Sequence, residues 1–388
     1  MNSRATQILV AILIFSLGSA CAESLGISNL RFSDNPITLG EWFTISFDYE
    51  GVAEKYTIEN TYETTGGEVK REVKEFVLKP EEKGKFRGKI SLRWKTENPN
   101  VKPYRIFKVA MMGGEGIKSN VLSGEVKVIR PLSGEDVKIP MELKTIFGTK
   151  LINLSATIFK PIGGEKLPLL VLNHGTPRDE GARKKVIPNK EQGRAFARKG
   201  FTVALPLRRG HGTSEGDYAE YAGDCDNSEY DNPAREAVKD IRAVVDYMKK
   251  QPYVDTGRKI LLVGQSAGGF SSLAYASAYP DEVVAVINFA GGRGRVAPYK
   301  VCNEWRLVNT MGNFGKTFKG PTLWIYTDQD DYFEPRLAKT MFEAYRSEGG
   351  TGKFVSFSSE FGHAFFAMAT RTWEPVIEEF LKEINPRK

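Results

Sequence analysis

Histidine and cysteine are both scarce in this chain of 388 residues, which contains three of each. Any chemistry that depends on an imidazole must therefore use His174, His211 or His363. The chain has no CxxC pair, and no group of these residues has the spacing of zinc ligands. The sequence thus predicts no bound metal and no cofactor.

The chain also lacks a strongly basic segment, although its formal net charge is +7. Basic and acidic residues are interspersed throughout, and the densest basic cluster, residues 183–185, follows Asp179 and Glu180 closely. A short charged run of this kind is typical of a solvated loop, so we expect no nucleic-acid partner. Since 41% of the residues are hydrophobic, the chain can bury a substantial core, and its length suits two domains.

Long apolar runs are missing as well, and the longest one near the N-terminus is too short to span a bilayer. Arg4 precedes this run, which covers residues 8–17. The residues Ala20-Cys21-Ala22 follow and are typical of a signal-peptidase site. The sequence therefore predicts a signal peptide at residues 1–22, a mature chain starting at Glu23, and export to the periplasm or the medium.

An alternative is that Cys21 becomes a lipid-modified N-terminus that anchors the protein to a membrane. Bacterial lipoproteins usually carry leucine three residues before that cysteine, whereas Gly18 stands here, so a cleaved product is preferred. After cleavage only Cys225 and Cys302 remain. Because disulfides form in exported proteins, we expect these two cysteines to pair.

Residues 23–130 consist of short alternating segments separated by turn residues such as TTGG, PEEKG and ENPN. Helical periodicity is missing, which favours an antiparallel β-sandwich of the immunoglobulin-like type. We expect a module for packing or orientation, with polymer binding as the alternative. The expected strands include residues 41–50, 71–80, 84–94, 104–112 and 124–129.

Residues 131–388 have a different rhythm, in which apolar strands alternate with helices. The strands lack polar alternation, as expected when helices cover both faces of a sheet. This pattern predicts an α/β fold with a doubly wound, mostly parallel sheet, whose working loops follow the carboxyl ends of the strands. The expected strands are 156–161, 167–175, 201–207, 259–264, 283–292, 321–328 and 353–359, and the helices are 189–200, 233–252, 267–280, 334–350 and 373–384.

One serine lies between an expected strand and an expected helix in the pattern Gly264-x-Ser266-x-Gly268. A serine on so sharp a turn adopts strained backbone angles, and the flanking glycines remove Cβ atoms that would clash there. Its hydroxyl then stands clear of the sheet at the amino end of a helix, where the dipole favours negative charge. Ser266 is therefore the candidate nucleophile, and a glycine-rich turn without chemistry is the alternative.

A serine hydroxyl needs a base to remove its proton, and the base must be one of the three histidines. His363 follows the last expected strand, on a loop that can reach back over the sheet, so we assign it as the base. His174 is expected to shape the turn after its strand, and His211 to anchor a loop.

The base in turn needs a carboxylate that fixes its tautomer. Asp328, Asp330 and Asp331 all end one strand, and spacing alone does not choose among them. The order Ser, acid, His is the order expected in this architecture. The oxyanion of a tetrahedral intermediate also needs donors, which we assign to the backbone N–H of Ala267 and to Thr176 in the loop after strand 167–175.

The stretches LNHGTP, LPLRRGHGTSEGDY, GQSAGGFSSLA, PTLWIYTDQDDYF and FGHAFF resemble the α/β-hydrolase superfamily over residues 131–388. Within it, the chain is similar to exported relatives of the dienelactone hydrolase and acyl-CoA thioester hydrolase/bile-acid acyltransferase group. In these relatives the segment matching YTDQDD usually reads Tyr-Gly-x-x-Asp, with the last aspartate catalytic. That match implies Asp330 as the acid, with Thr327 in the place of the usual glycine and Asp328 as the alternative.

The resemblance also bears on the reaction. Dienelactone hydrolases use a cysteine nucleophile, whereas Ser266 points to ester or amide hydrolysis. The thioesterase branch carries an N-terminal β-sandwich too, but export argues against a coenzyme A substrate. We therefore expect an exported serine esterase that acts on a small-molecule or polymer-linked ester, with residues 292–320 forming a cap. A peptidase or amidase, and a non-catalytic envelope binding protein, are the alternatives.

Overall fold

The computed structural model describes residues 25–33, 37–39, 42–64, 67–80, 87–96, 101–129, 131–145, 148–163 and 166–384. The expected signal peptide, residues 1–22, and Cys21 within it lie outside the described residues. The chain divides into two units, residues 1–129 and 130–388. None of the helices in the described ranges is both long and apolar enough to cross a membrane.

The N-terminal unit is built from two β-sheets, one with strand order β1-β3-β6 and one with order β2-β8-β7-β4-β5. Neighbouring strands are antiparallel except for the short parallel pair β2 and β8. The strands are β1 (Gly26–Phe32), β2 (Ile37–Thr38), β3 (Trp42–Glu50), β4 (Lys55–Thr64), β5 (Val69–Val77), β6 (Arg87–Lys95), β7 (Val101–Met112) and β8 (Leu122–Ile129).

Aromatic side chains join the two sheets of this unit. Phe107 of β7 is fully buried, and its ring lies 5.7 to 5.8 Å from the rings of Phe32, Phe43 and Trp94, which come from the three strands of the other sheet. The sheets therefore face each other across one apolar core, as in a β-sandwich. The sequence pattern does not predict β4, because its inward positions include Asn60 besides aromatic and aliphatic residues.

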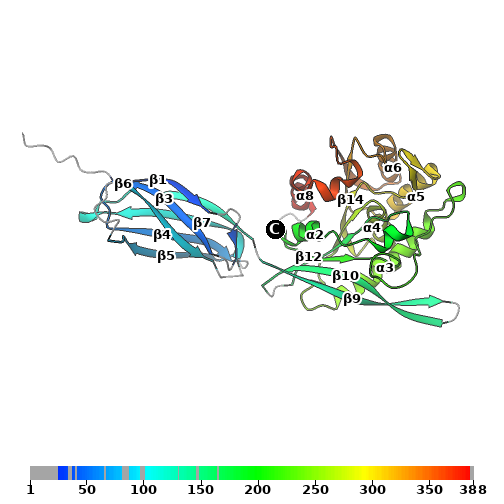
Figure 1. Ribbon diagram of the computed structural model, residues 1–388, viewed down its shortest axis with the longest axis horizontal. Coiled ribbons are helices and arrows are strands. Elements are labelled where there is room, and N and C mark those ends of the chain that lie inside the picture. The colour runs from blue at the N-terminus through cyan, green and yellow to red at the C-terminus, as the bar shows by residue number, and fades with distance from the viewer. Residues whose placement is uncertain are drawn as a thin grey trace, which may run out of the picture. The chain divides into compact units, whose positions relative to one another are not determined.

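The C-terminal unit alternates strands and helices along the chain (Figure 1). Its main strands are β9 (Leu132–Thr145), β10 (Gly148–Pro161), β11 (Leu169–Asn173), β12 (Thr202–Pro206), β13 (Ile260–Gln265), β14 (Val283–Phe289), β17 (Pro321–Thr327) and β18 (Thr351–Phe357), with the small pair β15 (Arg295–Ala297) and β16 (Lys300–Val301). Its helices are α1 (Glu180–Lys184), α2 (Lys190–Ala197), α3 (Asp231–Lys249), α4 (Ala267–Ala278), α5 (Glu304–Thr317), α6 (Pro335–Ser347), α7 (Phe365–Met368) and α8 (Thr370–Ile384), and 3-10 turns occur at η2 (Cys225–Asn227) and η3 (Gly362–Ala364).

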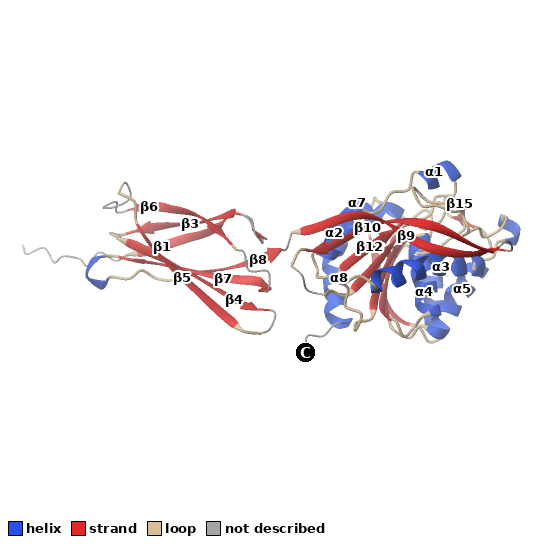
Figure 2. Cartoon of the chain, turned by 90° about the horizontal axis from the view of Figure 1, so that it is seen from below, coloured by secondary structure: helices blue, strands red, loops and turns tan. Residues whose placement is uncertain are grey.

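One eight-stranded sheet organises this unit, in the order β18-β17-β14-β13-β11-β12-β10-β9. The six strands from β18 to β12 in this order are parallel to one another, whereas β10 pairs antiparallel with both β12 and β9. Apolar residues of α3, α4, α5 and α6 pack on one face, and those of α2, α7 and α8 pack on the other. Figure 2 shows α3, α4 and α5 on one side of the sheet and α2, α7 and α8 on the other. This is the doubly wound, mostly parallel sheet that the sequence predicts.

Two features of this unit differ from the sequence-based expectation. The long β9–β10 hairpin adds an antiparallel edge to the sheet, although only residues 156–161 of it are expected as a strand. Of the expected cap at residues 292–320, residues 292–296 and Cys302 line the pocket beside Ser266, whereas the remainder contains α5, whose residues Leu307 and Phe314 are buried in the main core. This helix covers the sheet as an ordinary crossover helix does, because its apolar residues recur at helical spacing.

Candidate active site

Ser266 lies in the tight turn from β13 into α4, with φ of 56° and ψ of −125°. A non-glycine residue in this region is strained, and such strain is typical of a nucleophile held on a sharp turn. The flanking glycines are required sterically. A Cβ on Gly264 would lie 2.2 Å from the carbonyl oxygen of Gly268, and a Cβ on Gly268 would lie 2.1 Å from that of Asn173. The turn can therefore form only with glycine on both sides of the serine.

The loop after β11 runs directly beside this serine. A Cβ on Gly175 would lie 3.2 Å from Ser266 Cβ and 3.8 Å from its Oγ. Ala267 follows Ser266 as the first residue of α4, so its N–H has no acceptor within the helix. Within the described ranges, neither the Ala267 N–H nor the Thr176 N–H donates to a backbone carbonyl. Both assigned oxyanion donors thus line the same pocket as Ser266, and among the described residues their N–H groups have no backbone acceptor.

His363 and Asp330 contact each other in the loops at the carboxyl ends of β17 and β18. His363 Nδ1 lies 3.0 Å from Asp330 Oδ2 and 3.2 Å from Oδ1. The Asp330 side chain is completely buried, and its Oδ1 also accepts the backbone N–H groups of Tyr332 at 2.7 Å and Phe333 at 3.1 Å. These bonds fix the carboxylate, and the Nδ1 contact leaves His363 Nε2 free to accept a proton.

The structure separates the three aspartates that spacing leaves equivalent. Asp328 is exposed and accepts the backbone N–H of Ser359 at 3.2 Å. Asp331 forms an ion pair with Arg295 at 2.9 Å. In the part of the chain that the structure describes, Asp330 is the aspartate that contacts His363.

His363 and Ser266 are linked through the residue that precedes the serine. The Gln265 side-chain amide donates to the His363 carbonyl oxygen at 3.0 Å. No hydrogen bond between Ser266 Oγ and the His363 ring occurs among the described residues, and catalytic hydrogen bonds are often long before substrate binds. The imidazole stacks on the Tyr332 ring, with centroids 3.9 Å apart and an interplanar angle of 1°. This stacking holds the ring in one orientation.

The other two histidines are buried in the loops that follow β11 and β12, at the carboxyl ends of the strands. His174 Nδ1 contacts the Gly175 carbonyl at 2.6 Å, and His174 Nε2 accepts the backbone N–H of Arg208 at 3.0 Å. His211 Nδ1 contacts the Arg209 carbonyl at 3.0 Å. With both ring nitrogens engaged, His174 has no free lone pair, so it cannot act as the base without losing a buried hydrogen bond.

Because His174 and His211 are buried, we expect the folded protein to lose stability as the pH falls. Burial, reinforced by the charge of Arg208, lowers the pKa of His211 to about 3 and that of His174 well below its ordinary value. Below pH 6.5 these two histidines therefore bind protons in the unfolded chain but remain neutral in the folded chain. The free energy of unfolding falls by up to about 1.4 kcal/mol per pH unit for each histidine, and for His211 this continues towards pH 3.

Urea denaturation between pH 7 and pH 5 measures this slope. In His211→Asn the amide can still donate to the Arg209 carbonyl but does not titrate, so the slope is expected to fall by about half. An unchanged slope in this variant contradicts the prediction.

A pocket of about 530 Å³ opens in front of Ser266. Thr176, Ser266 and Ala267 lie in its wall. Its aromatic lining is Tyr218, Tyr221, Tyr332 and Phe333, and its arginines are Arg178, Arg183, Arg293 and Arg295. Mixed aromatic and polar walls of this kind suit a small organic group with polar substituents.

Cys225 and Cys302 form a disulfide, the pairing expected from the sequence. The bridge lies in the pocket wall and joins the loop before α3 to the loop before α5. It therefore ties together two segments of the pocket that are 77 residues apart in the chain.

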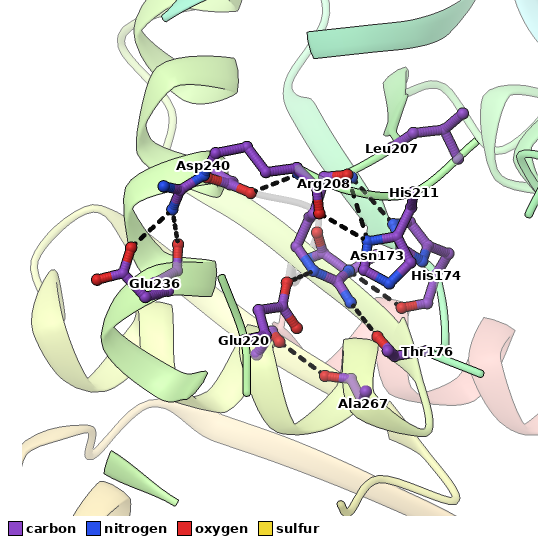
Figure 3. Close-up of polar contacts among 12 residues, drawn as sticks. Asn173, His174, Thr176, Leu207, Arg208, His211, Glu220, Glu236, Asp240 and Ala267 are labelled. Carbon is purple, nitrogen blue, oxygen red and sulfur yellow. Dashed lines mark hydrogen bonds and ion pairs between the residues drawn. The ribbon is translucent and has the colours of Figure 1, made fainter. Parts of the chain in front are cut away.

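A buried charged cluster under the pocket is the feature that sequence reasoning misses. Arg208 is completely buried and forms an ion pair with Glu220, and the neighbouring Arg209 pairs with Asp240 at 2.5 Å (Figure 3). In the sequence, the feature that could have indicated this cluster is the Arg208-Arg209 pair directly after the expected apolar strand 201–207. Across the described residues, no three His, Cys, Asp or Glu side chains gather as ligands for a metal ion.

A family model described as serine aminopeptidase, S33, matches residues 188–308, which contain Ser266 but neither Asp330 nor His363. An esterase structure from Pyrococcus furiosus is 15% identical with a TM-score of 0.46, covering 65% of this chain and 90% of its own. An acetyl xylan esterase from Paenibacillus sp. R4 is 17% identical with a TM-score of 0.43, covering 73% of this chain and 84% of its own.

Est1E from Butyrivibrio proteoclasticus with bound ferulic acid is 18% identical with a TM-score of 0.42, and the alignment covers 59% of this chain and 96% of that one. No match was found among curated protein sequences.

Proposed function

We propose that residues 130–388 form a member of the α/β-hydrolase superfamily, and that this protein is a serine hydrolase that cleaves carboxylic esters. The family match over residues 188–308 and the strand order of the sheet support this proposal. The observation that carries the proposal is the strained turn at Ser266, which opens onto a pocket and lies beside the loop of Thr176. A hydroxyl fixed next to free N–H donors is the arrangement that acyl transfer requires.

In the proposed reaction, Ser266 Oγ attacks the ester carbonyl carbon while His363 Nε2 takes the hydroxyl proton. The carbonyl electron pair moves onto oxygen, and the Ala267 N–H and a donor of Thr176 stabilise the resulting charge. His363 then gives its proton to the departing alcohol, which leaves an acyl-enzyme. Water, activated by the same imidazole, releases the acid and restores Ser266. Asp330 keeps His363 in the required tautomer and stabilises its protonated form.

Two measurements on the purified protein test this function. Hydrolysis of p-nitrophenyl acetate or butyrate is expected, together with covalent labelling of Ser266 by a fluorophosphonate. Absence of both results would contradict the proposal, and would favour a non-catalytic binding protein in which the N-terminal sandwich carries the function.

A peptidase or amidase is the second candidate, and the match to a family described as serine aminopeptidase favours it. Ester and amide cleavage use the same nucleophile and base, but an amine is a poorer leaving group and needs protonation by His363. A panel of aminoacyl-naphthylamides, compared with simple esters at equal concentration, discriminates the two. Higher kcat/KM on any aminoacyl substrate than on the esters assigns the protein to this second class.

Export belongs to the proposal as well, and the disulfide between Cys225 and Cys302 supports it because such bonds persist in oxidising compartments. N-terminal sequencing of the protein recovered from an exporting host tests it. A chain that begins at Glu23 is expected, whereas a blocked, lipid-modified Cys21 would indicate the anchored form.

A further inference from the structure

Arg208, the second residue after the end of β12, makes three side-chain contacts although its side chain is completely buried. Its Nη1 donates to the His174 carbonyl at 3.0 Å, and its Nη2 donates to Thr176 Oγ1 at 3.1 Å. Its Nε donates to Glu220 Oε1 at 2.5 Å. Figure 3 shows the guanidinium between Glu220 and Thr176. Arg208 thus fixes both the backbone and a side chain of this loop.

The contact with Arg208 determines where the Thr176 hydroxyl proton can point. A hydroxyl has one hydrogen to donate and two lone pairs, whereas a guanidinium can only donate. One lone pair of Thr176 Oγ1 is therefore occupied by Arg208, and the hydroxyl hydrogen must point elsewhere. Among the described residues, no acceptor is hydrogen-bonded to this hydroxyl. Since Thr176 lines the same pocket as Ser266 and Ala267, its hydrogen is available to a group bound there.

The Thr176 hydroxyl contacts a charged group of a buried ion-pair network. Glu220 forms ion pairs with both Arg208 and Arg293, and all three side chains are buried. Two guanidinium groups share the Glu220 carboxylate, and the neighbouring Arg209 pairs with both Glu236 and Asp240, so three arginines and three carboxylates form this network. Burial lowers the pKa of Arg208 to about 10, so the group still carries its charge at neutral pH. In a water-poor site this charge polarises the hydroxyl that it contacts.

We propose that the Thr176 hydroxyl is a catalytic donor to the oxyanion, and that Arg208 is the positioning residue that orients it. The inference rests on the proposed ester hydrolysis and names the atom of Thr176 that takes part. The hydroxyl donates a hydrogen bond when the carbonyl electron pair moves onto oxygen, and it keeps its proton throughout. Substrate carbonyls carry less charge, so the bond strengthens mainly in the transition state.

A pair of substitutions at Thr176 isolates the hydroxyl. Thr176→Val keeps the shape, the β-branch and the backbone N–H but replaces the hydroxyl by a methyl group. With p-nitrophenyl butyrate, kcat is expected to fall by about 10- to 100-fold while KM changes by less than about threefold. Thr176→Ser keeps the hydroxyl and is the matched control, with kcat expected within about threefold of the wild type. A Thr176→Val enzyme within threefold of the wild type overturns the proposal.

Inhibition by a transition-state analogue distinguishes loss of oxyanion stabilisation from a structural disturbance of the active site. For a trifluoromethyl ketone, which forms a tetrahedral oxyanion with a serine, Ki is expected to rise in Thr176→Val by the factor that kcat/KM falls. An unchanged Ki with a reduced kcat overturns the proposal. Failure of the proposed function is distinguishable, because then the wild type itself neither hydrolyses esters nor reacts at Ser266.

The role of Arg208 is tested in a double-mutant cycle with Arg208→Lys, after circular dichroism has shown that the variants fold. If Arg208 acts through Thr176, the double variant has a kcat within about threefold of Thr176→Val alone. If the double variant instead loses kcat by the product of the two single-variant factors, Arg208 does not act through Thr176 and the positioning role is overturned. If Arg208→Lys does not fold, Thr176→Val and its serine control decide the proposal alone.

Discussion

Replacing Ser266 by alanine is expected to reduce kcat/KM for p-nitrophenyl butyrate by about five to six orders of magnitude. The hydroxyl forms the covalent acyl-enzyme in the proposed mechanism, and no other group can take its place on the strained turn. Labelling by a fluorophosphonate is expected to disappear in parallel. Steady-state kinetics and intact-protein mass spectrometry measure the two effects.

Ser277→Ala is the matched control for this experiment. Ser277 lies on the same helix, α4, near the end remote from Ser266, and its hydroxyl contacts Thr317 Oγ1 at 2.6 Å. Activity within about twofold of the wild type is expected for this control. If Ser266→Ala retains more than about 1% of the wild-type kcat/KM, another residue is the nucleophile and the proposed mechanism is wrong.

The second large effect is expected for Asp330→Asn, with a loss of about 10³- to 10⁴-fold in kcat. The amide keeps the size of the carboxylate and can still accept from the N–H groups of Tyr332 and Phe333. Its amide hydrogens, however, favour the tautomer of His363 whose proton is on Nε2. That tautomer cannot accept the proton of Ser266, so turnover falls while substrate binding is retained.

Asp328→Asn provides the comparison, since Asp328 follows the same strand but is exposed and accepts the backbone N–H of Ser359. Its kcat is expected within about threefold of the wild type. Equal losses in the two variants, or a larger loss in Asp328→Asn, would transfer the role of the acid to Asp328 and contradict the assignment of Asp330.

Much of the C-terminal unit is predictable because its strands are short, apolar and separated by helical segments. The residues expected for β13, β14 and β17 agree with the structure to within a few positions. The hairpin of β9 and β10 is harder to predict from the sequence, since one side of β9 is exposed and the strand is rich in charged residues. Helix α5 is amphipathic, but its two glycines and the preceding loop suggest an irregular segment.

The candidate site divides in the same way. The motif around Ser266 and the position of His363 after the last strand follow from sequence alone. The choice among three aspartates does not, because Asp330 differs from Asp328 in burial and orientation and not in residue type. The contact of Arg208 with Thr176 joins residues 32 positions apart in the chain, and nothing in the spacing of either residue indicates it.

The sequence by itself determined which local structures form, because apolar periodicity and the glycines beside Ser266 act over a few neighbouring residues. It also limited the possible bases to three histidines. Only the tertiary structure decided which groups meet. Because the strands are parallel, the loops after β11, β12, β13, β17 and β18 all lie at the carboxyl ends of the strands. Burial there decides which charges are paired and which protons remain free.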